Sequence, residues 1–532
     1  MKRKIAAVTT GLLAAVLVAC GGPGADGEGA AIVVGTTDGL TLTPDAPAPL
    51  DPAYAYDLGT WNILRQGVQT LMIQPNGEGD PVPEAAESCG FLGGDNEAFA
   101  CTLREDLKFS DGNPITANDV KYSIERALAV RADSGVFALL STVRSVETKG
   151  DREVVFHLTD PDATFPFKLT TPVAGIVNPR FYRADELRNG LTLDGSGPYT
   201  LKAEQQDGAL RSITFTRNPQ YRGTLKVNNH TVVLRTFPDA EAMGAALEGG
   251  DIDVMTRTMS SKQITKYADY PDGKIRLLEI PGLEIRYLGF NTDAPPVHDK
   301  AVRQALAQVI DRASLVSEVY GTQASELYSI VPAGIVGHSN PFFNKYGKPS
   351  TARARAILQE ADIPTPVPLA LHYTTDHYGS ATKQEFEVLR RQLNNTGLFD
   401  VTIDGSPWKT FRPAERDGKF AVYGMGWFPD FPDADSYIAP FLDKDNMLKS
   451  PYVNPQIRQV LIPRSRRESD RLAASVDSLE TIQEIVADDV PILPLWQSKQ
   501  YLAAADDITG LAYAVNASAT LQLWELRRGA SE

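Results

Sequence analysis

The sequence predicts a large mixed α/β protein, and two recurring hydrophobic patterns support this prediction. Apolar runs of strand length occur at Val154–Leu158 and Ser212–Thr216, with Asp, Gly and Pro nearby, and a longer extended run covers Leu283–Asn291. Elsewhere apolar residues return every three or four positions behind the capping residues Thr116 and Asp299, as in amphipathic helices. A chain of 532 residues is too long for one hydrophobic core, so two or three domains are expected.

Three helices are predicted in detail. The first follows Thr116 and Asp119, which have the spacing of a capping box, and its core-facing residues are Val120, Ile124, Ala127 and Leu128. The second follows Asp299, and its apolar face consists of Val302, Ala305, Leu306, Val309 and Ile310. The third begins near Lys383 and ends at Gly397, with an inward face of Phe386, Leu389 and Leu393.

Composition excludes several classes of protein. The chain has 52 Lys and Arg residues against 67 Asp and Glu residues, and the resulting net charge of −15 argues against a nucleic-acid partner, since phosphates require a basic surface. Three cysteines in so long a chain exclude a disulfide scaffold and most zinc modules. A large, acidic, water-borne protein of several domains remains.

The N-terminus has the pattern of an export signal. Basic residues at positions 2–4 precede an uncharged, mostly apolar run, Ile5–Ala19, which is shorter than the roughly 20 residues that span a bilayer. The run ends in Leu17-Val18-Ala19-Cys20, which resembles the bacterial lipobox. We therefore expect residues 1–19 to be a signal peptide and Cys20 to be acylated after cleavage. An ordinary secretory signal with an incidental cysteine is the alternative.

Residues 20–30 are expected to form the lipidated cysteine and a flexible tether, because the stretch GGPGADGEGA cannot pack into a core. The acyl chains would hold the protein at the extracytoplasmic face of the cell membrane. No later run approaches the roughly 18 consecutive apolar residues of a membrane span. Contact with the membrane is therefore expected only through the N-terminal lipid.

Cys89 and Cys101 are predicted to form a disulfide. They lie 12 positions apart in a turn-rich segment that contains Gly90, Gly93 and Gly94, and export removes the chain from the reducing cytoplasm. Closing so short a loop contributes on the order of 3 kcal/mol in the chain-entropy model. A free pair and a metal site are the alternatives, and the second lacks neighbouring histidines.

Motifs of catalysis are absent from the sequence. It contains no H-E-x-x-H, no G-x-x-x-x-G-K-[ST] and no G-x-S-x-G. Among six histidines, His372 and His377 lie close together beside Asp376, where a metal site is a minor alternative to polar surface. We therefore expect neither an enzyme nor a cofactor.

Aromatic residues interleaved with acids and glycines are the most distinctive feature of the sequence. Tyr54 and Tyr56 lie near the mature N-terminus, and Trp408 and Trp427 lie far downstream. Aromatic rings beside a carboxylate suit an organic cation such as a peptide ammonium. Composition alone favours the alternative, in which the rings fill a core and the acids are solvated.

Sequence motifs in a fixed order carry a family resemblance. They are Leu50–Pro52, residues 109–120 (FSDGNPITANDV), 195–199 (GSGPY), 217–221 (RNPQY), 249–253 (GGDID) and 291–311 with its NT, VRQAL and ID elements. In these motifs the chain resembles the peptide/nickel family of solute-binding proteins of bacterial ABC importers, which are extracytoplasmic oligopeptide- and dipeptide-binding proteins. The resemblance extends over most of the mature chain, and the ordered set is specific where one motif alone is weak.

The resemblance implies a periplasmic-binding-protein-like α/β fold, in which two lobes close on a ligand about a hinge and a third domain is inserted. Carried onto this chain, domain I comprises 31–62, 180–280 and 500–532, the inserted domain II comprises 63–179, and domain III, the second lobe, comprises 281–499. The function implied is capture of an oligopeptide-like solute in the interdomain cleft. A monomer would then deliver the solute to an ABC permease with cytoplasmic ATPases.

The resemblance also implies part of the ligand site. In oligopeptide binders the tryptophan of a W-K-T-F stretch is followed by that of a Gly-Trp pair and then by an acid, and Trp408, Trp427 and Asp430 have this spacing. Asp430 is therefore expected to pair with the peptide α-ammonium, as a charge-assisted hydrogen bond. Trp408 and Trp427 would wall side-chain pockets, and the remaining expected contacts are Tyr54, Tyr56 and Gly426.

Two departures from the family pattern concern the other end of the ligand. Positions at which oligopeptide binders carry arginines hold Glu415 and Gly424, with Arg412 and Arg416 nearby but out of register. The segment 371–378, where dipeptide binders place a carboxylate-pairing arginine, contains none. The C-terminal carboxylate of a short peptide thus lacks its usual partner. The same fold with a metal chelate, a sugar or a secreted metabolite as ligand, or a peptide-sensing role, is the alternative.

Overall fold

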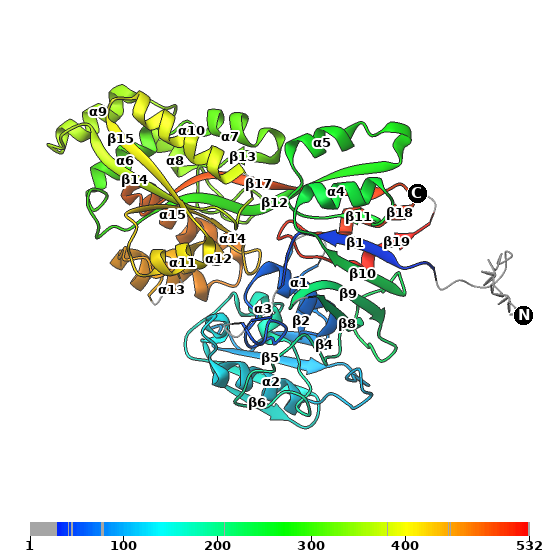
Figure 1. Cartoon of the computed structure of the whole chain (residues 1–532). Helices are drawn as coiled ribbons and strands as arrows, with labels where there is room; N and C mark the ends of the chain where they lie inside the picture. The colour runs from blue at the N-terminus through cyan, green and yellow to red at the C-terminus, as the bar shows by residue number, and fades with distance from the viewer. Residues whose placement is uncertain are drawn as a thin grey trace, which may run out of the picture.

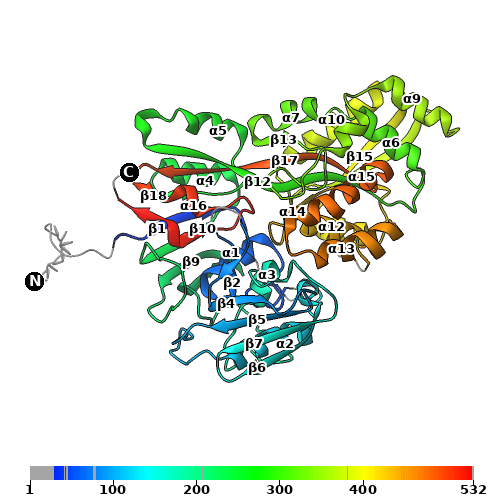
Figure 2. The ribbon, with the colours of Figure 1, turned by 180° about the vertical axis from the view of Figure 1, so that it is seen from behind.

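Two long strands run through the centre of the computed structural model, which describes residues 29–529 except 41, 44, 45, 76–78, 207, 380, 445 and 447. The strands β12 (Ile275–Phe290) and β17 (Ile492–Ala505) pair antiparallel along most of their length. Figure 1 shows an α/β lobe at either end of this pair and a smaller region below one of the lobes. Seen from behind in Figure 2, the same two strands again pass from lobe to lobe.

The main sheet extends through both lobes. Its strands lie in the order β15-β14-β16-β12-β17-β11-β1-β10-β9-β8, and β13 pairs with β17 outside this path. At one end β14 is parallel to β15 and β16, and at the other β1 is parallel to β10 and β11. The remaining bounds are β1 Ile32–Thr36, β8 Tyr199–Gln206, β9 Ala209–Arg217, β10 Thr231–Thr236, β11 Val254–Met255, β13 Ala324–Glu326, β14 Val367–Thr374, β15 Phe399–Ser406 and β16 Val422–Trp427.

The smaller region is built on an antiparallel sheet in the order β4-β5-β7-β6. Its strands are β4 Ala86–Phe91, β5 Ala98–Leu103, β6 Val143–Lys149 and β7 Glu153–Leu158. Two short hairpin-like pairs complete the described strands, and these are β2 Met72–Ile73 with β3 Val82–Pro83 and β18 Ile508–Thr509 with β19 Arg527–Arg528.

Helices surround the sheets in all three parts of the molecule. In the lobe that contains β1 and in the smaller region they are α1 Leu58–Gly67, α2 Ala117–Val130, α3 Phe165–Lys168, α4 Ala240–Glu248, α5 Ser261–Ala268 and α16 Leu511–Ala514. In the other lobe they are α6 Lys300–Val309, α7 Arg312–Val319, α8 Pro341–Tyr346, α9 Thr351–Glu360, α10 Ala381–Asn395, α11 Trp408–Arg416, α12 Asp435–Leu442, α13 Ile462–Arg467, α14 Arg471–Ala474 and α15 Glu480–Asp489.

The strands and helices predicted from pattern are confirmed. Val154–Leu158 lies in β7 and Ser212–Thr216 lies in β9, whereas Leu283–Asn291 covers only the second half of β12. The Thr116 backbone N–H donates to Asp119 at 2.7 Å in the predicted capping box, and Asp299 accepts from the N–H of Ala301. In α10 the inward residues are Phe386, Leu389 and Leu393, as predicted.

Two of the family-like motifs have a clear structural role. The carboxylate of Asp51, in the Leu50–Pro52 motif, is fully buried and accepts hydrogen bonds from both terminal nitrogens of Arg126, at 2.8 and 2.6 Å. Gly197 lies so close to α1 that a Cβ there would come within 2.5 Å of the carbonyl carbon of Gly67. The GSGPY stretch therefore needs glycine for a close approach of two backbones.

Hydrophobic packing is organised around the long strands. One core contains buried residues from Leu283 to Trp496 with Ala517, and a second contains residues from Ile32 to Ile280 and from Leu502 to Leu526. The second core runs through both the predicted domain I and the predicted domain II. The predicted boundaries at 280/281 and 499/500 fall inside β12 and β17, where Pro281 pairs with Lys499.

Cys89 and Cys101 are joined by a disulfide across β4 and β5, as predicted. Cys20, the signal peptide and the tether up to residue 28 lie outside the described residues. Within the described part of the chain, no helix has the length and apolar character that crossing a membrane requires.

Candidate ligand-binding site

A pocket lies where the two lobes and the smaller region meet. Its walls are α1 and residues 68–74 on one side, residues 516–524 on another, and residues 429–432 of the opposite lobe. Glu84 contributes from the smaller region. The pocket encloses about 830 Å³ of empty space, including its open mouth, which is a volume typical of small-molecule sites.

Asp430 is the predicted site residue that lines this pocket. It follows β16 in the second lobe, and its backbone N–H donates to the hydroxyl of Ser436 at 2.9 Å. Its carboxylate accepts a hydrogen bond at 3.1 Å from the hydroxyl of Tyr56, which comes from the other lobe. Burial raises the pKa of Asp430 to about 7, although the Tyr56 hydrogen bond and the charges of Arg65 and Lys168 act against this rise.

Aromatic contacts link Tyr56 to a partly buried arginine that lines the pocket. The rings of Tyr56 and Trp61 lie 5.7 Å apart, and the Trp61 indole N–H donates to the carbonyl of Ala55 at 2.8 Å. The guanidinium of Arg65, one turn further along α1, lies 5.2 Å from the centre of the Trp61 ring. Burial lowers the pKa of Arg65 to about 10, with Asp430 acting in the opposite direction, so Arg65 remains a cation at neutral pH.

Glu84 is a second buried carboxyl group in the pocket. It accepts hydrogen bonds from the Gln69 side-chain amide at 3.2 and 3.0 Å and from the hydroxyl of Tyr221. Burial raises the pKa of Glu84 to about 7, while these hydrogen bonds and Arg104 lower it. Because both oxygens of Glu84 are occupied, its main effect is to fix the orientation of the Gln69 amide.

The Gly426–Trp427 pair, also predicted as a ligand contact, lies at the end of β16. The Trp427 indole is buried, donates to the carbonyl of Ser436 at 2.7 Å and packs edge-on against Phe441. A Cβ at Gly426 would come within 2.7 Å of a guanidinium nitrogen of Arg286, so the glycine makes room for this arginine. Neither residue lines the pocket, and ligand contact through them stays a prediction.

Trp408 begins α11 and belongs to a different aromatic cluster. Its indole stacks on His377 with ring centres 3.8 Å apart and meets Tyr378 edge-on. His372 stacks instead on Phe420, and its Nδ1 lies 3.5 Å from Asp404. Trp408 does not line the pocket, and its contact with a ligand stays a prediction. The two histidines stack on different rings. Among the described residues, no group of three or more His, Cys, Asp or Glu side chains is arranged to hold a metal ion.

Tyr54 precedes α1 by four residues and is partly exposed. Its backbone N–H donates to the carbonyl of Asp51, which places it in the turn that leads toward Tyr56. Tyr56 contacts Asp430, and ligand contacts for both Tyr54 and Tyr56 stay predictions.

Sequence reasoning missed two arginines near the site. Arg286 on β12 lies with its guanidinium 3.6 Å from the centre of the Tyr378 ring, in the region where the sequence lacks an arginine. It is already paired with Glu284 at 3.0 Å. In the sequence, Arg65 stands out only as the one cation of α1, a helix whose other residues are mostly buried. A lone charge on a buried helical face is the one signal that points to it.

Comparison with known proteins identifies the class. The family model "Bacterial extracellular solute-binding proteins, family 5 Middle" matches residues 80–449, which is well over half of the chain. The chain therefore belongs to family 5 of the bacterial extracellular solute-binding proteins. It is an extracytoplasmic solute-binding protein, and since the family consists of binding proteins, the prediction that the chain is not an enzyme is confirmed.

Individual relatives are similar to this chain along most of its length. The chain is 24% identical over 480 residues to the "Probable D,D-dipeptide-binding periplasmic protein DdpA" of Escherichia coli K12, covering 88% of this chain and 90% of that protein. The dipeptide-binding protein of Pseudoalteromonas sp. SM9913 in complex with Met-Leu superposes with a TM-score of 0.80 at 19% identity, over 94% of this chain and 100% of the other.

A third similar structure, AgaA of A. tumefaciens R10 in complex with agropinic acid, gives a TM-score of 0.78 at 22% identity and covers 94% of this chain and 99% of that one. These structural matches confirm the predicted fold, a periplasmic-binding-protein-like α/β architecture of the size class found in large peptide binders.

Proposed function

We propose that this protein captures a short peptide between its lobes and delivers it to the permease of an ABC importer. The observation that supports the peptide most directly is Asp430, a partly buried carboxyl group in the pocket, whose carboxylate accepts its one hydrogen bond from the described residues from Tyr56 across the cleft. A peptide α-ammonium would supply the charge partner that the protein does not.

Relatives whose names state a ligand support a peptide as the ligand of this protein. The D,D-dipeptide-binding protein and the structure with Met-Leu are named for peptides, whereas AgaA holds agropinic acid. The ligands in these names are all small polar molecules. The buried acid favours a cationic amine, and hence a peptide, over a neutral sugar.

The lobes of this proposal follow the predicted division. Domain I comprises 31–62, 180–280 and 500–532, domain II 63–179 and domain III 281–499, with the hinge in β12 and β17. Tyr56 and Asp430 lie on opposite sides of that division and are hydrogen-bonded, as expected when the two lobes approach each other on a ligand.

Peptide capture is tested by thermal unfolding of the mature protein with pools of di- to pentapeptides. A bound peptide raises the Tm, since ligand stabilises the native state by RT ln(1 + [L]/Kd). N-acetylation of the best peptide removes its ammonium and should weaken binding about 10- to 100-fold. If no pool shifts the Tm and native mass spectrometry finds a retained non-peptide solute, the metabolite alternative replaces the peptide.

The proposal includes membrane attachment through acylated Cys20, supported by the lipobox-like sequence Leu17–Cys20. Expression of the full chain in a bacterial host should place it in the membrane fraction with a lipid-sized mass increase on its N-terminal peptide. Cys20→Ser should release it or leave it unprocessed. A wild-type chain that is secreted without lipid would contradict the anchor and leave the binding function unaffected.

A further inference from the structure

Several residues that line the pocket carry a buried side-chain atom without a hydrogen-bond partner. Among the described residues, fifteen buried side-chain nitrogen or oxygen atoms have no hydrogen-bond partner, and five of them belong to residues that line this pocket. These five are Nη1 of Arg65, Nε1 of Trp524 and the Oε1 atoms of Gln69, Gln74 and Gln522. Buried polar atoms are normally satisfied, so this concentration marks where a polar ligand completes the protein's hydrogen bonds.

The three glutamine oxygens are acceptors, and two of them are held in place. Gln69 donates its amide nitrogen to both oxygens of Glu84, which leaves its Oε1 free. Gln74 donates its amide nitrogen to the carbonyl of Gly79 at 2.6 Å, which leaves its Oε1 free as well. Acceptors of this kind suit N–H groups, such as the amides of a peptide backbone.

Arg65 and Trp524 are the two donors of the set. Arg65 forms no ion pair and no hydrogen bond with any described residue, although it feels the charge of Asp430. Its guanidinium is fixed by the face of Trp61, at 5.2 Å from the ring centre. A guanidinium with one buried, unpaired nitrogen and no ion-pair partner among the described residues is arranged to receive an anion from a ligand.

The surrounding acceptors restrict which anion can bind. Asp430, Glu84 and the three glutamine oxygens would repel a phosphate or another multiply charged group. A single carboxylate on a molecule that also carries an ammonium and amide N–H groups matches every one of these partners. Arg286, the other arginine near the cleft, is already paired with Glu284 at 3.0 Å.

We infer that Arg65 and Trp524 bind the C-terminal carboxylate of the peptide, so that the ligand is a short peptide with both ends free. This inference rests on the proposed peptide function and names the partner for the end opposite the ammonium. In place of the arginine that the segment 371–378 lacks, the protein offers an arginine from α1. Arg65 is thereby a specificity-determining residue, which selects free acids over amidated or longer peptides whose carboxylate lies elsewhere.

The test compares matched ligands rather than absolute affinities. A pool of di- and tripeptides of alanine, leucine and lysine is prepared as free acids and as C-terminal amides, and Kd is measured by titration calorimetry for the tightest binder and its amide. The wild-type protein should bind the acid about 10- to 100-fold more tightly than the amide. In Arg65→Gln this ratio should fall to near one, because the acid loses its cation while the amide loses little.

Three variants isolate the effect. Trp524→Phe removes one N–H and should reduce the acid-to-amide ratio at least threefold, even if Arg65→Gln does not fold. Asp430→Asn should weaken acid and amide equally and keep the ratio. Arg104→Gln removes the same charge from an arginine that donates to the backbone carbonyl of Glu84 and does not line the pocket, so its ratio should match that of the wild type.

The outcomes separate the two proposals. A wild-type protein that binds peptides with an unchanged ratio in both Arg65→Gln and Trp524→Phe overturns this inference and leaves peptide binding standing. A wild-type protein that binds no peptide of the pool overturns the proposed function and this inference with it.

Discussion

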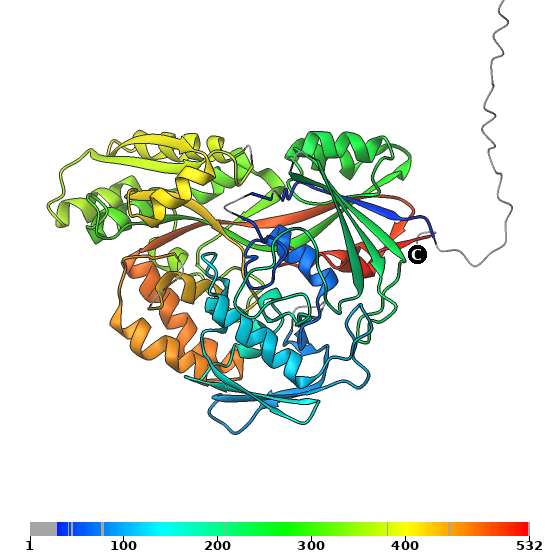
Figure 3. The ribbon, with the colours of Figure 1, turned by 60° about the horizontal axis from the view of Figure 1, so that its bottom comes forward.

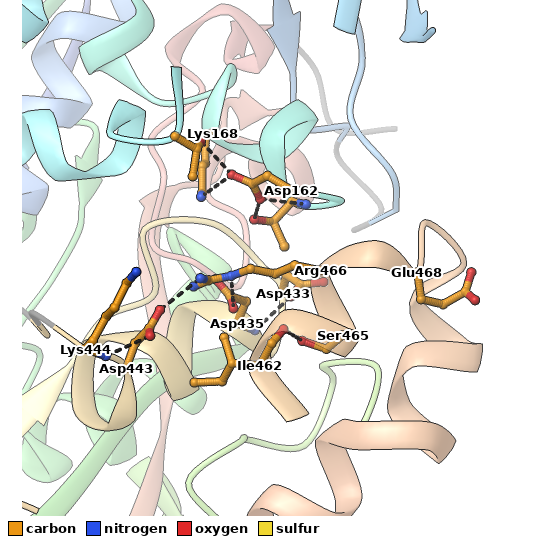
Figure 4. A network of polar contacts seen from close by, with 12 residues as sticks. Asp162, Lys168, Asp433, Asp435, Asp443, Lys444, Ile462, Ser465, Arg466 and Glu468 are labelled. Atoms are coloured by element: carbon orange, nitrogen blue, oxygen red, sulfur yellow. Dashed lines mark hydrogen bonds and ion pairs between the residues drawn. The ribbon is translucent and has the colours of Figure 1, made fainter. Parts of the chain in front are cut away.

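Two sets of charged side chains differ in whether the protein pairs them with an opposite charge. The first is the pocket, in which Asp430 and Arg65 form no ion pair with any described residue, although each acts electrostatically on the other. The second is a paired cluster of Asp162, Lys168, Asp433, Asp435, Asp443, Arg466 and Arg471. Figure 4 shows Arg466 with Asp435 and Asp443, facing Asp162 and Lys168 from the smaller region.

Asp162 and Asp430 make the contrast quantitative. Lys168 binds Asp162 at 2.6 Å, and although burial opposes ionisation, Lys168 and Arg466 hold the pKa of Asp162 at about 2. The same lysine acts on Asp430 only at a distance, and burial raises the pKa of that carboxyl to about 7. The two carboxyl groups therefore shift in opposite directions, because the protein pairs the fully buried Asp162 with a cation but gives the partly buried Asp430 only a hydrogen bond from Tyr56.

The paired cluster also lies where the second lobe contacts the smaller region. The backbone N–H of Ala163 donates to the carbonyl of Arg466 at 2.8 Å, and the Asn96 side chain donates to the carbonyl of Arg467 at 2.9 Å. Figure 3 shows α13 and its neighbours (orange) beside the smaller region (cyan). Charges that are paired within the protein thus lie at the contact between these parts, and charges without an ion-pair partner among the described residues lie at the pocket.

Arg471→Met should have the largest effect. Arg471 donates to both oxygens of Asp433, at 2.7 and 2.9 Å, and the two side chains are 7% and 4% exposed. Removing the arginine leaves a buried carboxylate without a cation, which should lower the free energy of unfolding by about 3–5 kcal/mol in urea titrations.

The matched control is Arg464→Met, which breaks an ion pair with Asp477 whose side chains are more than half exposed. It should change stability by less than about 1 kcal/mol. If Arg471→Met were no more damaging than this control, the cluster would not be the stabilising counterpart of the pocket.

Asp430→Asn should act on stability with the opposite sign in the ligand-free protein. The folded pKa of Asp430, about 7, lies above the unfolded value near 3.8, so ionisation costs the folded state free energy that is absent below pH 4 and complete above pH 7. Asp430→Asn avoids this cost. Its free energy of unfolding should exceed that of the wild type by about 1–4 kcal/mol at pH 8 and differ little at pH 4.

Asp162→Asn provides the comparison for this measurement. The pKa of Asp162 is depressed to about 2, so its ionised form stabilises the folded state above pH 4, and this contribution is lost as the pH falls through 2. The variant should therefore be less stable than the wild type at pH 8. If Asp430→Asn and Asp162→Asn changed the free energy of unfolding at pH 8 in the same direction, the pocket and the paired cluster would not differ as described.

The sequence predicted the fold further than it predicted the site. Capping residues such as Asp299 and the apolar faces behind them identify helices, because both signals are local. β12 was predicted from Leu283 but begins at Ile275, since the register with β17 along its first half is set by pairing with a strand more than 200 residues away. Local pattern carries no record of such a partner.

The site shows the same limit more strongly. Asp430 was found through its spacing from Trp408 and Trp427, yet neither indole lines the pocket, because spacing along the chain does not fix which way a ring points. Arg65, Gln69 and Trp524 converge from distant segments, and their shared property, an unpaired buried polar atom, exists only in three dimensions.

The smallest predicted effect is the pH dependence of peptide affinity, and it tests the pocket directly. An ammonium binds the ionised form of Asp430, so below pH 7 each complex must first release a proton. Affinity should fall by up to tenfold per pH unit between pH 7 and pH 5, and also decline above about pH 8 as the peptide amine loses its charge. Titration calorimetry at pH 5, 6 and 7 measures the slope.

Glu84 must be separated from Asp430 in this experiment, because the pKa of both is raised to about 7 in the same pocket, where Arg65 is the facing cation. Glu84→Gln should keep the slope, since Gln69 and Tyr221 already occupy the Glu84 oxygens. Asp430→Asn should flatten it between pH 5 and pH 7. A slope that persists in Asp430→Asn and disappears in Glu84→Gln would assign the ammonium to Glu84 and reverse the orientation of the ligand in the pocket.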